Sequence, residues 1–208
     1  MKFIIGIVFF SFTLTAFGQD YPDSGFTNKA EAKNLTVNGT KEGKWVEYRD
    51  SNLTKTKDST APYYMLTVYK TDKPNGIIRG YYKSGKLMSS ATYVNGKKNG
   101  VAKLYFESGK LRVEGAYIDG IENGVISTYY ENGTLNLEIP CTDGKKDGMV
   151  KLYYENGTLL IESPYTNGIQ NGVTKKFHQN GKIYSETTYN NGVKGATKTY
   201  DENGNETK

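Results

Sequence analysis

Residues 100–123 read GVAKLYFESGKLRVEGAYIDGIEN, and this stretch is one copy of a unit that recurs along most of the chain. The recurrence is marked by two series of glycines, each of which advances in steps of 24 positions. The first series is Gly76, Gly100, Gly124, Gly148 and Gly172, and the second is Gly85, Gly109, Gly133, Gly157 and Gly181. A fixed period of this length is typical of a repeat protein, in which each unit packs only against its neighbours.

Each unit is predicted to be a β-hairpin. Residues 101–106 alternate with period two, as a strand does, and residues 111–117 supply the return strand. The loop between them, Glu-Ser-Gly at 107–109, suits a type I turn closed by a left-handed glycine and a bulge. The Asp119-Gly120 pair supplies the positive φ of the connection to the next unit. Because one hairpin is marginal in water, we expect an all-β fold, an elongated twisted antiparallel sheet of tandem 24-residue hairpins.

The turn also predicts which side chains share a face. A three-residue loop pairs Tyr105 with Leu111, and counting outward pairs Lys103 with Val113 and Val101 with Gly115. Directly opposed residues lie on the same side of a sheet. The predicted core face of this unit is therefore Val101, Tyr105, Leu111, Val113 and Tyr117. The other face, which is mixed in character, is predicted to carry Ala102, Leu104, Phe106, Arg112 and Glu114.

The first 18 residues, MKFIIGIVFFSFTLTAFG, have the pattern of a signal peptide. Lys2 supplies a positive charge, residues 3–10 are an apolar run, and the small residues Ala16 and Gly18 precede a cleavage point before Gln19. The apolar run is shorter than the roughly 20 residues of a membrane span. We expect cleavage near Gly18–Gln19 and an extracytoplasmic mature chain, periplasmic, surface-located or secreted, without a transmembrane segment. A buried N-terminal strand is the alternative, but nothing near it is patterned like a core strand.

The predicted organisation is a signal peptide at 1–18, an N-terminal arm at 19–36 and a repeat array over 37–208. The glycines that mark the first two units lie 33 positions apart, nine more than the repeat allows. The surplus is the polar stretch near 54–62, which we expect to form a longer hairpin end or a surface loop.

Composition limits the possible functions. A chain of 208 residues accommodates this array and no second domain, and its hydrophobic content of 36% is low for a thick core. The net charge of +5 is mild and interspersed, so no nucleic-acid partner is predicted. The single cysteine, Cys141, excludes an intrachain disulfide.

No catalytic, cofactor-binding or metal site is predicted, and we expect the protein not to be an enzyme. His178 is the only histidine, and no second histidine or cysteine stands near it to complete a metal site. A nucleophilic pair of His178 with Cys141 is formally possible but lacks a third group. A glutamate also recurs in every unit, which gives each copy the same environment rather than the unequal environments of an acid and a base. These glutamates are Glu114, Glu138, Glu162 and Glu186.

Two further sets of recurring residues are candidates for binding. A basic residue at the third position of several units would form a basic track edged by tyrosines, able to hold an anionic chain or to pack cations on rings within the sheet. The members of this set are Arg79, Lys103, Lys151 and Lys175. The turn side chains Asn132, Asn156 and Asn180 are the second set of candidate contact groups.

The units at 124–135, GVISTYYENGTL, and 148–159, GMVKLYYENGTL, resemble the MORN repeat variant family, and the resemblance spans residues 37–204. Bacterial members of this family include exported 24-residue-repeat proteins and YwqK-like antitoxins. The resemblance implies a scaffold or binding role without catalysis. Our leading hypothesis is a module that binds a protein or a glycan at the bacterial envelope. The alternative is an antitoxin or immunity-type protein that neutralises a toxin by binding it, and an edge strand near Tyr200 is a candidate for self-association.

Overall fold

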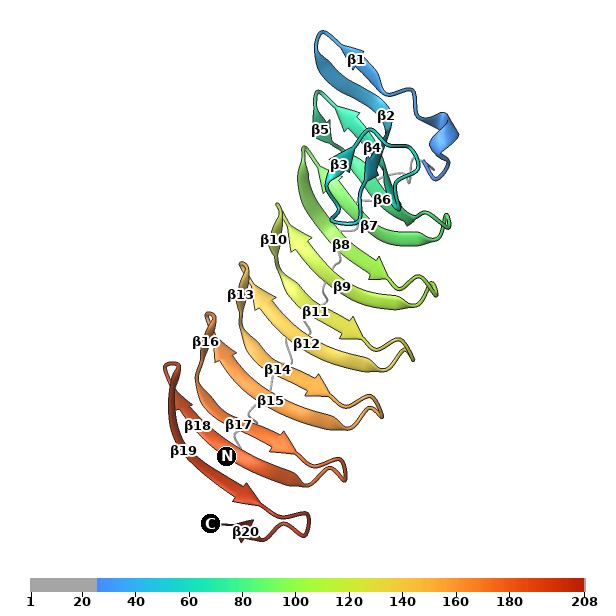
Figure 1. The fold of residues 1–208 in the computed structure, drawn as a ribbon. Helices are drawn as coiled ribbons and strands as arrows, with labels where there is room; N and C mark the ends of the chain where they lie inside the picture. Colours follow the sequence, from blue (N-terminus) through green and yellow to red (C-terminus); the bar gives the residue numbers. More distant parts are fainter. Residues whose placement is uncertain (1–25, 208) are drawn as a thin grey trace, which may run out of the picture.

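The computed structural model describes residues 26–207, so the predicted signal peptide and the first part of the arm lie outside the described residues. Within that range the chain forms one 20-stranded sheet in which every pairing is antiparallel, with one short 3₁₀ helix, η1 (Lys29–Glu31). The strands stack side by side into a long, twisted array that runs from β1 to β20 (Figure 1). The predicted all-β array of hairpin repeats is confirmed.

The N-terminal part of the array departs from the regular unit, whereas the part after β6 repeats. The N-terminal strands are β1 (Leu35–Val37), β2 (Thr40–Arg49), β3 (Lys55–Thr56), β4 (Tyr63–Lys70), β5 (Lys73–Pro74) and β6 (Gly76–Tyr82). The next strands are β7 (Leu87–Val94), β8 (Lys97–Tyr105), β9 (Leu111–Ile118), β10 (Ile121–Glu122), β11 (Gly124–Tyr129), β12 (Leu135–Thr142) and β13 (Lys145–Lys146). The remaining strands are β14 (Gly148–Tyr153), β15 (Leu159–Thr166), β16 (Ile169–Gln170), β17 (Gly172–Phe177), β18 (Ile183–Asn190), β19 (Val193–Tyr200) and β20 (Glu206–Thr207).

Two kinds of turn alternate along the array, and both have the predicted form. At one end of the strands the Phe106 amide donates to the Lys110 carbonyl at 2.9 Å, and Gly109, with a φ of 90°, closes the three-residue loop. At the other end Asp119 and Gly120 both have positive φ, at 50° and 88°, as a type I′ turn requires.

The pairing of the two strands, however, departs from the predicted register just after the Tyr105–Leu111 pair. Tyr105 pairs with Leu111 as expected, but the next pair is Leu104 with Val113, which leaves Arg112 as an extra residue on the return strand. Such a β-bulge sets two residues against one and shifts every later pairing by one position. The same shift recurs in the other units at Met88, Asn136, Leu160 and Tyr184.

The bulge makes the predicted core face wrong, because it moves half of the set to the other side of the sheet. Val101 and Tyr105 lie on the face that carries the pair Lys103 and Glu114, which we call the charged face. Val113 and Tyr117 lie on the opposite face with Leu104. Val101 is 51% exposed and Leu104 is 44% exposed, so neither face of this unit is a closed core.

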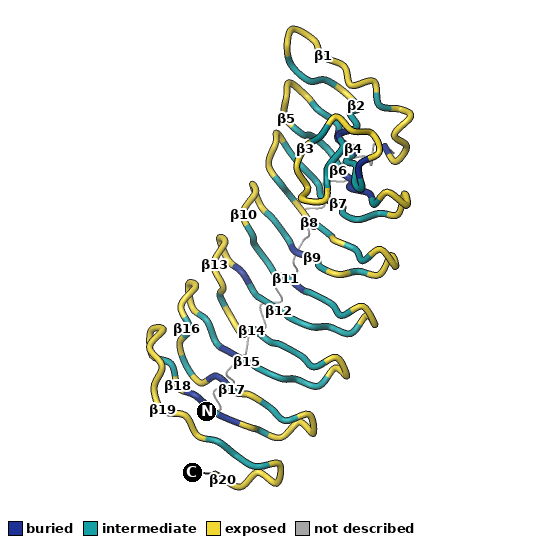
Figure 2. Tube along the Cα trace, viewed as in Figure 1, coloured by how far each residue is buried: buried dark blue, intermediate teal, exposed yellow. Residues whose placement is uncertain are grey.

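The first strands are covered on both faces, as the concentration of buried residues around β3–β6 shows (Figure 2). On the charged-face side the arm places Phe26, fully buried, against Leu66 and Tyr81. On the opposite face the segment 50–62, which contains β3, folds across the sheet (Figure 1), and Lys55 of this segment contacts Glu47 at 2.8 Å. We call this doubly covered region, residues 26–82, the N-terminal cap.

Candidate binding faces

The charged face carries an unbroken row of polar residues that crosses the array from strand to strand. Each member is the direct cross-strand neighbour of the next, because every unit places the same position at the same height in the sheet. The row runs Lys103, Glu114, Ser127, Glu138, Lys151, Glu162, Lys175, Glu186 and Lys198. Lysine and glutamate largely alternate, so the row is nearly neutral as a whole although each position is charged or polar.

This row corrects the prediction of a basic track. The lysines were expected to stack without glutamates between them, with Lys103 opposite Val113. The bulge at Arg112 instead places Glu114 opposite Lys103, with the ammonium 3.7 Å from the carboxylate. Lys175 and Glu162 repeat the contact at 3.9 Å. The structure thus brings together on one face the recurring lysines and the recurring glutamates that the sequence analysis had treated separately.

Tyrosines on the same face hold the glutamates in place. The Tyr129 hydroxyl donates to Glu114 at 2.9 Å, and the Tyr153 hydroxyl donates to Glu138 at 3.0 Å. Tyr200 makes the same bond to Glu186 at 3.1 Å. Burial raises the pKa of Tyr153 to about 12, with smaller contributions from the hydrogen bond to Glu138 and from its negative charge. Three of the four glutamates in the row, Glu114, Glu138 and Glu186, are therefore each oriented by a tyrosine of the next unit.

An exposed apolar row runs parallel to the charged row, two residues away along each outgoing strand. Its members are Val101, Val125, Met149 and Val173, which are 51%, 49%, 38% and 42% exposed. Their cross-strand neighbours are Ala116, Pro140, Pro164 and Thr188, which are small or rigid. Successive members recur about every 10 Å, since one unit contributes two strands. Nothing among residues 26–207 covers this row.

Cation–π contacts are present, but other lysines make them. The ammonium of Lys98 lies 4.7 Å from the ring centre of Tyr117, and that of Lys146 lies 5.1 Å from the ring centre of Tyr165. These tyrosines belong to the opposite face, near the Asp-Gly and Asn-Gly turns, and each pairs with a glycine two residues after its lysine on the neighbouring strand.

The asparagines predicted as contact groups take part in the array itself. The Asn132 side chain donates to the Glu155 carbonyl at 3.1 Å and accepts from the Thr134 amide at 2.7 Å. Asn180 makes the same two bonds. Its side chain donates to the Glu202 carbonyl at 3.3 Å and accepts from the Lys182 amide at 3.0 Å. These side chains are exposed but already hydrogen-bonded, so they link the turns of neighbouring units.

His178 and Cys141 are not brought together. Cys141 lies buried in β12, and burial raises the pKa of its thiol. His178 follows β17, where its Nε2 is 3.1 Å from the Tyr200 carbonyl. Across residues 26–207 no three His, Cys, Asp or Glu side chains group closely enough to hold a metal ion. Nor does any helix within that range have the length and apolarity needed to cross a membrane.

The last strand is partly paired. Thr199 and Tyr200 of β19 pair with β20, whereas residues 193–198 have a strand on one side only among the described residues. Self-association through this edge stays a prediction.

Sequence reasoning missed the exposed apolar row, because it assigned Val101 to the core face of its unit. It also missed a ladder of hydrogen bonds at the three-residue turns, in which the Tyr130 hydroxyl donates to the Tyr153 carbonyl at 2.8 Å and Tyr154 to the Phe177 carbonyl at 3.0 Å. The recurrence of an aromatic residue just before each turn was the available signal.

These features define a class: an open β-hairpin repeat array, one sheet thick, that presents two long regular faces. Five segments of the chain match the MORN repeat variant model, at residues 74–95, 98–119, 122–140, 146–167 and 170–191. The chain belongs to the MORN repeat variant family, as the resemblance of its units implied. This family consists of repeat modules of a non-catalytic, binding type. No curated protein matches the chain.

Proposed function

We propose that this protein is an exported, non-enzymatic binding module that holds a protein or a glycan at the bacterial envelope, and that the charged face of the regular units is its binding surface. The observation that carries the proposal is the exposed apolar row beside the alternating charges, continuous over Val101, Val125, Met149 and Val173. An apolar strip with a polar rim is the usual composition of a protein interface. Tyrosine–glutamate hydrogen bonds hold the rim in one arrangement, which lowers the entropy lost on binding.

The surface is tested with a pair of matched variants. Val125→Asp with Met149→Asp places charges in the apolar row, whereas Ile121→Asp places one at an exposed hairpin end that is 51% exposed but off this row. Immobilised protein is exposed to solubilised envelope proteins and, separately, to cell-wall polysaccharide. A ligand retained by the wild type and by Ile121→Asp but lost by the double variant supports the proposal. A ligand retained equally by all three excludes this face.

Export is proposed from the signal-peptide pattern of residues 1–18. Its test is the intact mass of the native protein after cell fractionation. A species beginning at Gln19 outside the cytoplasm supports the proposal. A full-length species beginning at Met1 in the cytosol overturns it and favours the alternative, an antitoxin or immunity-type protein that neutralises a toxin by covering its surface. The same apolar row would also bind a toxin, so the location of the protein distinguishes an envelope binding module from an antitoxin.

A further inference from the structure

A second candidate site lies on the opposite face, under the segment 50–62 that interrupts the repeat. The segment and the sheet enclose a pocket of about 490 Å³ that is open on one side. Leu53 of the segment forms one wall, and Met65, Met88 and Leu104 of three different strands form the floor. This volume is within the range of small-molecule sites, roughly 300 to 1,000 Å³.

The floor is apolar and adaptable. Two of its side chains are methionines, which are unbranched and polarisable and which repack around ligands of varied shape. Leu104 is 44% exposed, although its neighbour across the return strand, Val113, continues the apolar surface. An apolar group that entered the pocket would remove these side chains from water.

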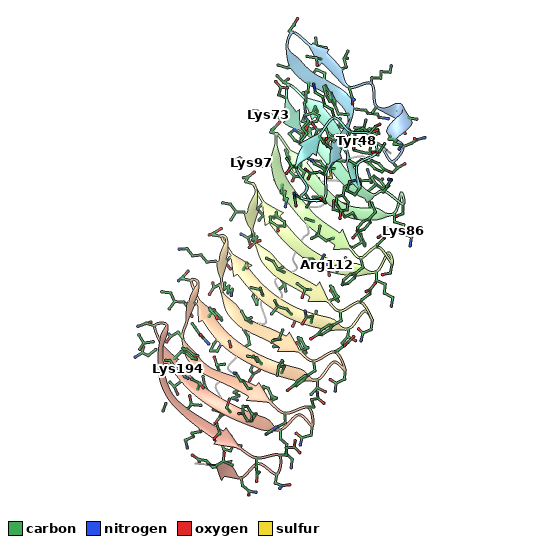
Figure 3. The ribbon with its side chains drawn as sticks, in the orientation of Figure 1. Tyr48, Lys73, Lys86, Lys97, Arg112 and Lys194 are labelled. Atoms are coloured by element: carbon green, nitrogen blue, oxygen red, sulfur yellow. The ribbon has the colours of Figure 1, made fainter. Side chains whose placement is uncertain are left out.

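Two arginines, Arg49 and Arg112, line the same pocket, and no acidic residue of the described chain does. Arg112 lies over the ring of Phe106 at 5.6 Å, and no carboxylate among the described residues pairs with it. It is on β9, below the 50–62 segment in the view of Figure 3. The equivalent positions in the other units carry no positive charge, being Met88, Asn136, Leu160 and Tyr184.

Arg49 contacts the carboxylate of Glu47, which two lysines also contact. Its guanidinium is 3.7 Å from Glu47, but the same carboxylate is also held by Lys41 and by Lys55, the latter at 2.8 Å. Three cations around one anion leave a positive charge beside the pocket. The local field therefore attracts an anion.

We propose that this pocket binds a small apolar carboxylate, whose hydrocarbon part lies on Met65, Met88 and Leu104 and whose carboxylate is held by Arg112 and Arg49. A guanidinium presents paired N–H donors that match a carboxylate, and it remains charged at every physiological pH. The site goes beyond the proposed function, because it lies on the face opposite the charged face, under the segment that interrupts the repeat. The acid group can belong to a free acid or to the last residue of a peptide chain.

Calorimetric titration of the whole protein tests the proposal, with octanoate as the probe and octanamide and octylammonium as controls of equal length. We expect octanoate to bind at one site and the neutral and cationic probes to bind at least about tenfold more weakly, since a hydrogen-bonded charge pair is lost. A tripeptide ending in leucine, with a free or an amidated C-terminus, identifies the source. Preference for the free C-terminus over octanoate assigns the site to peptide ends.

Two pairs of variants locate the site. Arg112→Gln should weaken octanoate binding about tenfold, whereas Lys110→Gln, which removes the same charge from the adjacent turn, should leave it unchanged. Leu104→Trp should fill the pocket and abolish binding, whereas Leu152→Trp, at the same register two units further along, should not. Circular dichroism verifies that each variant is folded. Absence of octanoate binding, equal binding of octanamide, or wild-type affinity in both pocket variants would overturn the proposal.

Discussion

The N-terminal cap and the regular units are made of the same hairpins but are stabilised in different ways. In the cap both faces of the sheet are covered, and Phe26 and Leu66 are fully excluded from solvent. In the regular units beyond the pocket under the 50–62 segment, the described chain places nothing over either face, and the buried residues are small ones such as Ser163, Thr174 and Cys141. A sheet one layer thick cannot bury large side chains, so its stability must come from contacts between neighbouring strands.

Those contacts repeat from unit to unit as ladders. The turn tyrosines bond to the carbonyl of the next unit, beginning with Tyr82 to Tyr105 at 2.8 Å, and face tyrosines bond to the preceding glutamates. Each bond is modest, but the bonds recur along the array. The cap therefore concentrates stability in a few side chains, whereas the regular units distribute it over many. The four predictions below test this difference.

The largest effect is expected from truncation in the cap. Leu66→Ala leaves a cavity beside Phe26 and Tyr81, and we expect it to lower the free energy of unfolding by about 2 to 5 kcal/mol. Val125→Ala, in a regular unit where the side chain is 49% exposed, should change it by no more than about 0.5 kcal/mol. Guanidinium unfolding followed by circular dichroism measures both.

The single tryptophan, Trp45 on β2, adds a local probe of the cap. If the cap is a separate cooperative unit, Leu66→Ala should move the fluorescence transition of Trp45 to lower denaturant more than it moves the dichroism transition of the array. If Leu66→Ala and Val125→Ala lowered the free energy of unfolding equally, the proposed difference between the cap and the regular units would be wrong.

The second prediction concerns the buried carboxylate of the cap. Burial alone would raise the pKa of Glu47, which is 6% exposed, but hydrogen bonds and charges from Lys41 and Lys55 outweigh it and lower the pKa to about 2. The unfolded chain, where the value is 4.5, therefore binds more protons between these pH values, and stability falls as the pH falls from about 4.5 to about 2. The expected loss is about 2 to 3 kcal/mol.

The measurement is the free energy of unfolding against pH for the wild type and for Glu47→Gln. The wild type should be more stable at neutral pH, and the difference should shrink as the pH falls through this window. Glu131→Gln, an exposed turn residue, serves as the control and should follow the wild type. Parallel curves for Glu47→Gln and the wild type would show that the carboxylate is not held by its cations.

The two regions also explain what the sequence could predict. The turns were predictable, because only particular residues tolerate a positive φ, and the glycines therefore mark them at a glance. The bulge was not, because its position accepts Met88, Arg112, Asn136, Leu160 or Tyr184, and no property unites these side chains. The predicted face assignments, basic track and core set were all wrong because they left out this one extra residue of the return strand.

The cap illustrates a different limit. The spacing of glycines located the insertion, but the repeat pattern contains nothing about where an interrupted segment will fold. Lys55 contacts Glu47, and Leu53 and Met65 line one pocket, but the periodic part of the sequence relates neither pair. The pocket was therefore invisible to sequence reasoning.

The third prediction tests the turn ladder. Tyr154→Phe removes the hydroxyl that donates to the Phe177 carbonyl, and we expect a cost of about 0.5 to 1.5 kcal/mol. The chain offers the reverse experiment, because Phe106 occupies the ladder position where neighbouring units have tyrosine. Phe106→Tyr should stabilise the protein by about 0.5 to 1 kcal/mol, since the new hydroxyl can reach the next unit. Denaturant unfolding measures both, and loss of stability in Phe106→Tyr would contradict the ladder.

The smallest effect is the titration of one tyrosine in each region. Burial, followed by the influence of the nearby carboxylate, raises the pKa to about 12 both for Tyr69, beside Glu47 in the cap, and for Tyr153, beside Glu138 on the charged face. A folded pKa above the unfolded value of 10 stabilises the protein below pH 10, and this stabilisation is lost as the pH rises to about 12. Glu138→Gln should therefore let Tyr153 ionise earlier and leave Tyr69 unchanged.

Ultraviolet absorbance titration of the single variant Glu138→Gln and of the double variant Glu138→Gln with Tyr153→Phe assigns the shifted signal. If the earlier ionisation disappears with Tyr153→Phe, the tyrosine–glutamate pair exists in solution and the charged face has a fixed arrangement. If Glu138→Gln leaves the titration unchanged, the carboxylate is not oriented by Tyr153. The alternating row would then be mobile, and a binding surface that relies on its rigidity would have to be sought on the other side of the sheet.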